Sequence, residues 1–341
     1  MKTYPKVLTI AGSDSGGGAG IQADLKTMSA LGVYGMSAIT AVTAQNTVGV
    51  RGIQPIAPEI VAMQIEAVMD DLSCDAVKIG MLHSRAIIET VADKLKQYVP
   101  RFIVVDPVMI STSGHKLLED DAIACIVDEL FPIATVVTPN IDEAEYLSGM
   151  KIENETDMQQ AAERLLKMGC RAVLMKGGHL ETDCMTDLLF ITGETPYRLT
   201  SPRIESVNNH GTGCTLSSAI ASYLALGNDL PHAVAAAKQY ISEGLAHGAG
   251  IKIGHGHGAL NHFFAPQPLH IIEREMKITV NRKETEVTEN ATLDTVIAQQ
   301  SPAQENIAAA VNNRVIPRTE WEKTRLNEDD KITIIQAAFG G

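Results

Sequence analysis

The sequence is short of basic residues. Its 341 residues include 28 Lys and Arg against 41 Asp and Glu, which gives a formal net charge of −13. Nucleic acids and anionic membranes favour binding surfaces of the opposite sign, so we expect neither as a partner. An excess of acidic residues alone is typical of a protein that stays in solution.

Long apolar runs are missing as well. A membrane-spanning helix needs about 18 consecutive apolar residues. The best candidate, residues 219–237, is interrupted by the polar segment 228–232. The apolar run near the amino end, residues 7–11, is too brief for a signal peptide. We therefore expect a cytoplasmic protein that does not cross a membrane.

The five cysteines form no CxxC pair, and their odd number does not suit a disulfide framework. The glycine-rich segment 12–20 lacks both the lysine of a Walker loop and the spacing of a dinucleotide-binding loop. The segment His255-Gly-His-Gly with His262 has no carboxylate or cysteine to complete a metal site, which favours a structural or ligand-covering loop. These absences exclude the commonest zinc and Walker-type nucleotide sites.

Short apolar strands alternate with amphipathic helices along the first three quarters of the chain, which predicts an α/β fold with a mostly parallel sheet covered on both faces. The predicted strands are residues 6–11, 36–42, 75–80, 102–105, 135–138 and 171–176. The predicted helices are a segment that ends near Leu31, then 58–72, 84–98, 119–130, 156–168, a helix that follows Gly211, and 231–247. Residues 184–192 and 196–200 predict an antiparallel hairpin.

The segment Gly211-Thr-Gly-Cys214 precedes a helix whose apolar residues recur at helical spacing. Two glycines at a helix start leave backbone N–H groups open to a phosphate-sized anion. Cys214 lies at the edge of this anion hole, where the helix dipole should favour the thiolate. A tight turn with a small buried cysteine is the alternative interpretation.

Polar residues stand where the predicted strands end, namely Lys78, Asp106, Asn140, Glu143 and Lys176. The carboxyl ends of parallel strands share one edge of a sheet, so these side chains should converge. Singly, Asn140 and Glu143 could form a capping box, Asp106 a turn, and Lys176 a solvated strand end. Together they supply oxygen ligands for Mg²⁺ and a cation for a phosphate, which indicates phosphoryl transfer.

Several segments in fixed order resemble the bacterial hydroxymethylpyrimidine/phosphomethylpyrimidine kinases of thiamin synthesis, which belong to the ribokinase-like superfamily. The matching segments are 8–26, Thr43-Ala-Gln-Asn-Thr, Val77-Lys-Ile-Gly-Met, Asp106-Pro-Val-Met, Thr138-Pro-Asn-Ile-Asp-Glu, Lys176-Gly-Gly-His, His210-Gly-Thr-Gly-Cys-Thr and Gly254-His-Gly-His-Gly. The resemblance implies a ribokinase-like three-layer αβα domain over residues 1–265. It also implies phosphorylation of 4-amino-5-hydroxymethyl-2-methylpyrimidine, and then of its monophosphate, by ATP with Mg²⁺.

Carried over by position, the resemblance implies a role for each matching residue. The expected residues are Gln45, Gly12, Asp24 and Met81 for the pyrimidine, Asp106 and Glu143 for Mg²⁺, Asn140, Lys176, Lys238 and Thr212 for ATP, and Cys214, Gly211 and Gly213 for catalysis. Cys214 would be the general base for the substrate hydroxyl, which requires a lowered pKa. Related kinases for sugars or pyridoxal commonly carry Asp at this position, and a kinase of that type is the alternative.

The composition changes at residues 266–275, which we interpret as a linker before an independent module, 276–341. A predicted hairpin at 277–280 and 284–288, a helix after Thr292, and strands at 307–311 and 331–336 give the order ββαββ. This order and the terminal Gly340 and Gly341 resemble the thiamin sulfur carrier, a small α+β, ubiquitin-like β-grasp protein. The resemblance implies adenylylation of the Gly341 carboxylate by an E1-like enzyme and a thiocarboxylate delivered to a thiazole synthase. The alternative is a non-covalent docking domain, and a homodimer of the whole chain stays open.

Overall fold

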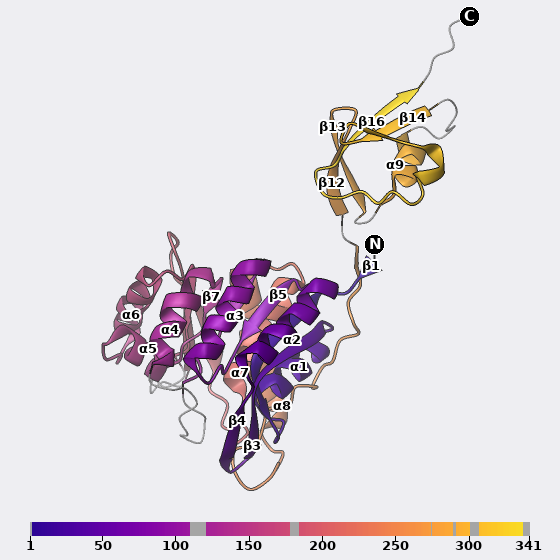
Figure 1. Cartoon of the computed structure of the whole chain (residues 1–341). Coiled ribbons are helices and arrows are strands. Elements are labelled where there is room, and N and C mark those ends of the chain that lie inside the picture. The colour runs from indigo at the N-terminus through magenta and orange to yellow at the C-terminus, as the bar shows by residue number, and fades with distance from the viewer. Residues whose placement is uncertain are drawn as a thin grey trace, which may run out of the picture. The chain divides into compact units, whose positions relative to one another are not determined.

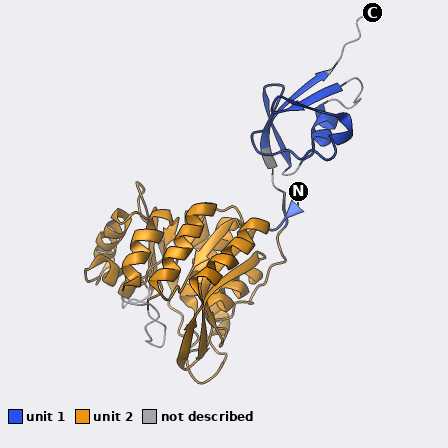
Figure 2. Cartoon of the chain, viewed as in Figure 1, with its two compact units in different colours: residues 1–4, 271–341 blue, residues 5–270 orange. Residues whose placement is uncertain are grey.

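A computed structural model describes residues 2–109, 121–177, 184–273, 275–288, 291–300 and 307–336. The chain divides into two compact units (Figure 2). One unit contains residues 5–270, and the other contains residues 1–4 with 271–341. Among the described residues, no helix combines the length and the apolar character that a membrane span would require.

The larger unit contains a central sheet (Figure 1). Among the described residues its strand order is β10-β9-β8-β7-β6-β5-β2-β3-β4. The strands are β2 (Lys6–Asp14), β3 (Tyr34–Asn46), β4 (Gly49–Pro55), β5 (Ala76–Ile79), β6 (Ile103–Val105), β7 (Val136–Val137), β8 (Ala172–Met175), β9 (Cys184–Ile191) and β10 (Tyr197–Pro202). From β3 to β8 all neighbours are parallel, whereas β4, β9 and β10 pair antiparallel. The mostly parallel sheet and the predicted hairpin are thus confirmed.

Helices cover both faces of this sheet, and the short parallel strands are therefore buried on both sides. The helices are α1 (Gly20–Ala30), α2 (Pro58–Asp71), α3 (Arg85–Tyr98), α4 (Ala122–Cys125) with the π-helical Ile126–Leu130 and the 3-10 turn Phe131–Ile133, α5 (Ile141–Ser148), α6 (Glu155–Lys167), α7 (Thr212–Ala225) and α8 (Leu230–Gly248). One apolar core joins α2, α3, α4 and α6 to the sheet, and a second core joins α1, α7 and α8 to the other face. The result is the predicted three-layer αβα arrangement.

The structure differs from the prediction at the edge strand β4, which the sequence analysis did not anticipate. Two glycines and a terminal proline in Gly49–Pro55 argue against a strand. An edge strand tolerates them because only one of its sides pairs, here with β3. β2 and β3 also continue beyond their predicted ends, to Asp14 and Asn46. Gln45 therefore lies on β3 and not in a loop.

The smaller unit contains a sheet with the order β13-β12-β16-β14-β15 among the described residues. Its elements are β12 (Glu275–Val280), β13 (Lys283–Thr288), α9 (Leu293–Gln300), β14 (Ile307–Val311), β15 (Arg314–Ile316), the 3-10 turn Arg318–Glu320 and β16 (Lys331–Gln336). β12 and β16 pair in parallel at the centre, while both hairpins are antiparallel. The buried Trp321, 2% exposed, lies in the core of this unit, and its ring N–H donates to Ile316 O at 2.9 Å. This topology confirms the predicted β-grasp.

The predicted linker, 266–275, is not one uniform segment. In the larger unit Gln267 N donates to Ala30 O and His270 N donates to Gly32 O, both at 2.8 Å. In the smaller unit β1 (Lys2–Thr3) pairs antiparallel with β11 (Ile272–Glu273). The chain therefore passes between the units twice, at residues 4–5 and 270–271.

Candidate active site

A cavity of about 1070 Å³ opens where the parallel strands of the larger unit end. It brings together residues that the sequence separates by up to 234 positions, from Ala11 to Leu245. The expected site residues that line it are Gly12, Gln45, Met81, Asp106, Asn140, Glu143, Lys176, Gly211, Thr212, Gly213, Cys214 and Lys238. Asp24 is the expected kinase residue that does not line it.

The start of α7 forms one wall of the cavity. Gly211 caps the helix with a left-handed φ of 79°, and a Cβ at this position would overlap with Gly18 O. A Cβ on Gly213 would come to 3.4 Å from Asp106 Oδ2 and 3.6 Å from Lys176 Nζ. The two glycines therefore allow the backbone amides of the first helical turn to approach both the glycine-rich loop and the Asp106–Lys176 pair. The helix start for which the sequence predicts an anion hole therefore lies next to charged residues.

Lys176, which follows β8, lies between two carboxylates. Its Nζ is 3.1 Å from Asp106 Oδ1 and 3.9 Å from Glu143 Oε2. Burial would lower the pKa of Lys176, but the two carboxylates more than offset that effect and raise it. Thr138 Oγ1 also donates to Asp106 Oδ1, at 3.1 Å. The lysine is thus held as a cation at the edge of the sheet.

Asn140 and Glu143 form the capping box that the sequence analysis kept as an alternative. Glu143 N donates to Asn140 Oδ1 and Asn140 N donates to Glu143 Oε2, both at 2.8 Å. Both residues also line the cavity, so the structural role does not exclude the functional one. Burial and the neighbouring Asp106 raise the pKa of Glu143 to about 7, although Lys176 opposes the shift.

The donor set suits magnesium. Asp106 and Glu143 offer carboxylate oxygens that approach one ammonium from two sides. Mg²⁺ is commonly held by one or two carboxylates together with substrate phosphates and water. Within the described ranges no three His, Cys, Asp or Glu side chains cluster as a closed metal cage. An arrangement with two carboxylates and open positions is what a metal shared with a nucleotide requires.

The expectation for the pKa of Cys214 was wrong. Burial raises the pKa of this thiol to about 11, and the carboxylates of Asp24 and Asp106 add to the rise. Lys78 and a hydrogen bond with the backbone of Gly20 act in the opposite direction but do not compensate. In the pocket as it stands, desolvation and nearby negative charge therefore outweigh the helix dipole, and the thiol is protonated near neutral pH.

Asp24 lies beneath the cavity and not in its wall. Its side chain is fully buried, accepts from Thr9 Oγ1 at 2.6 Å and pairs with Lys78 Nζ at 2.8 Å. The pKa of Lys78 is raised, because Asp24 more than offsets the effect of burial. The structure therefore places Asp24 with Lys78, a strand-end residue that the sequence analysis also noted, and outside the lining of the cavity.

Lys238 lies on α8 and extends into the cavity. Its Nζ donates to Asp187 Oδ2 at 2.6 Å, and Asp187 Oδ1 accepts from Gly177 N at 3.0 Å. Asp187 lies on β9 and lines the cavity, but the sequence analysis did not select it. Its sequence context is an apolar strand, and an acidic residue buried there could have been noticed as an exception.

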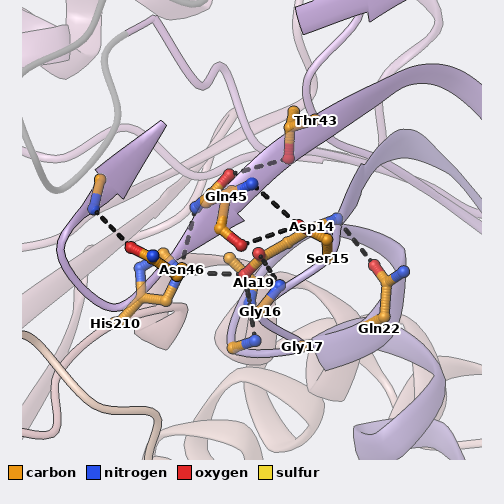
Figure 3. Close-up of polar contacts among 12 residues, drawn as sticks. Asp14, Ser15, Gly16, Gly17, Ala19, Gln22, Thr43, Gln45, Asn46 and His210 are labelled. Atoms are coloured by element: carbon orange, nitrogen blue, oxygen red, sulfur yellow. Dashed lines mark hydrogen bonds and ion pairs between the residues drawn. The ribbon is translucent and has the colours of Figure 1, made fainter. Parts of the chain in front are cut away.

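Gln45 faces the glycine-rich loop, whose conformation depends on Asp14 (Figure 3). The Asp14 carboxylate accepts from the amides of Gly16, Gly18 and Ala19 at 2.7, 3.0 and 2.8 Å. His210 Nε2 lies 3.1 Å from Asp14 Oδ2 and 3.2 Å from the amide of Gln45. Asp14 and His210 received no role from the sequence alone, although both lie within segments that resemble the kinase family.

Both units of the chain match known protein families. A family model described as phosphomethylpyrimidine kinase matches residues 14–261. The chain belongs to the phosphomethylpyrimidine kinase family. A second model, the ThiS family, matches residues 269–341. The protein is therefore a kinase that carries a ThiS domain at its C-terminus, as the resemblance implied.

Relatives of known name support the same conclusion. The hydroxymethylpyrimidine/phosphomethylpyrimidine kinase of Rhizobium meliloti is 53% identical over 75% of this chain and 96% of its own length. The thiamine biosynthesis bifunctional protein ThiED of Geobacter sulfurreducens is 51% identical over 76% of this chain, but the match spans only 53% of that protein. The kinase unit accounts for these matches.

Solved structures show the same fold. The phosphomethylpyrimidine kinase of Clostridium difficile has a TM-score of 0.63 and 49% identity, and covers 70% of this chain and 98% of its own. The pyridoxal kinase of Bacillus subtilis, solved with ADP, has a TM-score of 0.71 and 36% identity, and covers 76% and 98% of the two chains. The fold is therefore shared by kinases for pyrimidines and for pyridoxal.

The histidine and glycine segment 254–258 of the kinase unit packs on Thr47, at the tip of the β3–β4 hairpin. Added Cβ atoms on Gly254 and Gly256 would overlap with Thr47. Near this segment, His262 is 4% exposed and its Nε2 lies 3.1 Å from Thr215 Oγ1 of α7. No metal cluster involves these residues within the described chain. The segment is a loop that ties the hairpin to the start of α7.

His262 should make the stability of the kinase unit depend on pH. Burial lowers the pKa of this histidine from 6.5 to about 4. Below pH 6.5 the unfolded chain therefore binds a proton that the folded chain does not, and folding free energy is lost as pH falls toward 4. Between pH 7 and 5 the loss should be about 2 kcal/mol larger in the wild type than in His262→Gln.

Denaturant unfolding followed by circular dichroism at the two pH values measures this difference. His255→Gln is the matched control, because His255 is an exposed histidine of the neighbouring loop. An equal loss in the wild type and in His262→Gln would show that His262 does not control the pH dependence.

Proposed function

We propose that the larger unit transfers the γ-phosphate of MgATP to the hydroxymethyl group of 4-amino-5-hydroxymethyl-2-methylpyrimidine, and then phosphorylates the monophosphate to the diphosphate. One observation carries the proposal. The same cavity is lined by Gln45 and Met81 on one side, by the amides of α7 with Cys214 in the middle, and by Lys176 with its two carboxylates on the other. A pyrimidine, a transferred phosphoryl group and a nucleotide each find matching chemistry in that order.

In this proposal the residues divide the work by their chemistry. Gly12 and Met81 pack against the ring, and Gln45 pairs with its polar edge. Asp106 and Glu143 would hold Mg²⁺, which neutralises charge on the phosphates and aligns them. Lys176, Lys238, Asn140 and Thr212 contact the nucleotide, while the backbone amides of Gly211 and Gly213 stabilise the charge that develops on the transferred group. Asp24 acts from beneath through Lys78, and not by contact with the ring.

Cys214 is the proposed base for the first transfer. The substrate hydroxyl has to lose its proton as the new P–O bond forms, and the thiolate accepts it. The second transfer has a phosphate monoester as acceptor, which is already anionic and needs no base. The two reactions therefore place different demands on the same side chain.

The smaller unit is proposed as a sulfur carrier for thiazole formation. The terminal Gly340 and Gly341 lie outside the described residues, and the described chain ends with β16. An E1-like enzyme would adenylylate the Gly341 carboxylate, and a thiazole synthase would receive the sulfur. We further propose that residues 1–265 and 276–341 act as separate domains, and that both functions are exerted in the cytoplasm.

Acceptor specificity tests the kinase proposal directly. The purified chain is incubated with MgATP and one acceptor at a time: the hydroxymethylpyrimidine, pyridoxal or ribose. Pyridoxal belongs in the panel because pyridoxal kinases share the fold. We expect turnover of the pyrimidine to exceed that of the other two by at least about tenfold in kcat/KM, with mono- and diphosphate both appearing by chromatography. A preference for pyridoxal or ribose would replace this function with that of a different kinase.

Replacing the thiol should separate the two transfers. Loss of a general base lowers a rate by about 10²–10⁴-fold, so Cys214→Ala should slow monophosphate formation by that amount and diphosphate formation by less than about tenfold. Because the thiol has a pKa of about 11, the wild-type kcat/KM for the first transfer should also rise with pH from 7 to 9. The second transfer should lack this rise.

Single-turnover rates for each transfer, measured from pH 6 to 9, provide the test. The control is Cys170→Ala, which removes a buried thiol of the same unit that lies outside the cavity lining and donates to Leu165 O. Equal losses in both transfers of Cys214→Ala would mean that Cys214 orients the acceptor and does not abstract its proton.

A free terminal carboxylate is essential to the sulfur-carrier proposal. Two residues without Cβ atoms give a thin tail that can enter a narrow active site. One alanine appended after Gly341 should abolish adenylylation by a ThiS-activating enzyme, because the reacting carboxylate is then displaced by a residue. Mass spectrometry after incubation with enzyme and ATP compares the two tails, and activation of the extended tail would contradict the proposal.

A further inference from the structure

The side-chain amide of Gln45 can present its donor end and its acceptor end to a ligand in two opposite orientations. A carboxamide has a donor end and an acceptor end, and a half-turn about its last bond exchanges them. Left free, it can pair with an edge that carries a ring nitrogen and an amino group, or with an edge that carries N–H and a carbonyl. Gln45 alone therefore cannot distinguish an aminopyrimidine from the corresponding oxopyrimidine.

Asp14 supplies a fixed charge close to this amide. Burial would raise the pKa of its carboxyl, but hydrogen bonds from His210 and from the amides of Ala19 and Gly16 more than offset this and hold the pKa below its usual range. The carboxylate is therefore an acceptor only. Because His210 Nε2 lies 3.1 Å from Asp14 Oδ2, the ring must carry its hydrogen on Nε2 and donate it to the carboxylate.

The proton on Nε2 decides which end of Gln45 faces the ring. In Figure 3 the amide nitrogen lies at that end, 3.2 Å from Nε2, which would set two donors against each other. The other end lies 3.1 Å from Thr43 Oγ1, whose hydroxyl donates to Ser13 O at 2.9 Å and so has a lone pair to offer. The conflict is removed when the amide is turned: its oxygen then shares the Nε2 hydrogen with the Asp14 carboxylate, and its nitrogen donates to Thr43 Oγ1.

We propose that Asp14 and His210 act as a lock on the Gln45 amide, and that this lock makes the site selective for an amino edge over an oxo edge. In the locked orientation one lone pair of the oxygen and one hydrogen of the nitrogen stay free for a ligand. They match a pyrimidine edge with an exocyclic amino group beside an unprotonated ring nitrogen. The inference rests on the proposed function, in which Gln45 pairs with the pyrimidine.

The loop packing shows why the ring of His210 cannot turn away. His210 is 9% exposed, and its backbone N donates to Gly258 O at 3.0 Å. Gly18 lies flat against the ring, since a Cβ on Gly18 would come to 2.5 Å from His210 Cδ2. The same Gly18 donates its N–H to Asp14. Asp14 and His210 are thus positioning residues, which act on the ligand through Gln45.

The test compares two acceptors that differ only at this edge, 4-amino- and 4-oxo-5-hydroxymethyl-2-methylpyrimidine. The measured quantity is the ratio of their kcat/KM values, since a general structural defect lowers both and leaves the ratio unchanged. A mismatched buried hydrogen bond costs about 1–3 kcal/mol, so His210→Phe, which frees the amide to turn, should reduce the wild-type preference for the amino compound by about tenfold or more. His210→Gln, whose amide N–H can again donate to Asp14, should restore most of it.

Two further variants make the result decisive. Gly18→Ala keeps Asp14, His210 and Gln45 but pushes the ring, so it should also reduce the ratio, and it serves if His210→Phe fails to fold. His257→Phe changes an exposed histidine of the neighbouring loop and should leave the ratio as in the wild type. An unchanged ratio in both His210→Phe and Gly18→Ala would overturn the lock alone. A wild type inactive on both pyrimidines would overturn the proposed function and the lock with it.

Discussion

The cost of burying charge organises this site. Two carboxylates line the cavity and a third is buried outside its lining, and each is held by a lysine: Asp106 by Lys176, Asp187 by Lys238 and Asp24 by Lys78. A buried charge without a partner would cost several kcal/mol, so each pair is a condition for the fold as much as for the chemistry. Glu143 is the additional acid of this group, and burial, with a smaller contribution from Asp106, raises its pKa to about 7. A ligand that brings its own positive and negative charges can exchange partners with these pairs at little cost.

The close approach of two glycine segments is the second constraint. Gly211 meets Gly18 backbone to backbone, Gly18 meets the ring of His210, and the ring contacts Asp14. The amides at the start of α7 are therefore placed by the same loop that surrounds Gln45. One set of contacts therefore relates the proposed site of the transferred phosphoryl group to the proposed site of the acceptor. A change at either glycine would disturb both, because the start of α7 and the glycine-rich loop are in contact through their backbones.

The sequence predicts most of the fold and the meeting of the strand-end residues, because both follow from local patterns and from the rule that parallel strands end at one edge. Asp106, Asn140, Glu143 and Lys176 converge as expected for that reason. The prediction fails where tertiary context overrides the local pattern. β4 contains Gly and Pro and is a strand only because β3 pairs with it. The strand β15 was also missed. The Asn312-Asn313 pair before it was the signal in the sequence, because asparagine tolerates the left-handed φ of 50° and 67° that this tight hairpin turn requires. Asp24 lies in a helix that is buried on the sheet, and no feature of its neighbours in sequence shows that Lys78 comes within 2.8 Å.

The pKa of Cys214 could not be predicted from the sequence for the same reason. Its position at a helix start is readable from the sequence, but its pKa depends on how far the pocket removes it from water and on two carboxylates that arrive from other elements. Removal from water is the largest effect on the thiolate, whereas the helix dipole acts from one end and weakens within a turn. The balance raises the pKa to about 11. A thiolate formed under these conditions is a stronger base than one with a low pKa, and it is rarer. A divalent cation at Asp106 would offset one of the two negative charges that raise the pKa, whereas the phosphates of a nucleotide would add negative charge, so the pKa of the proposed base depends on the balance between the two.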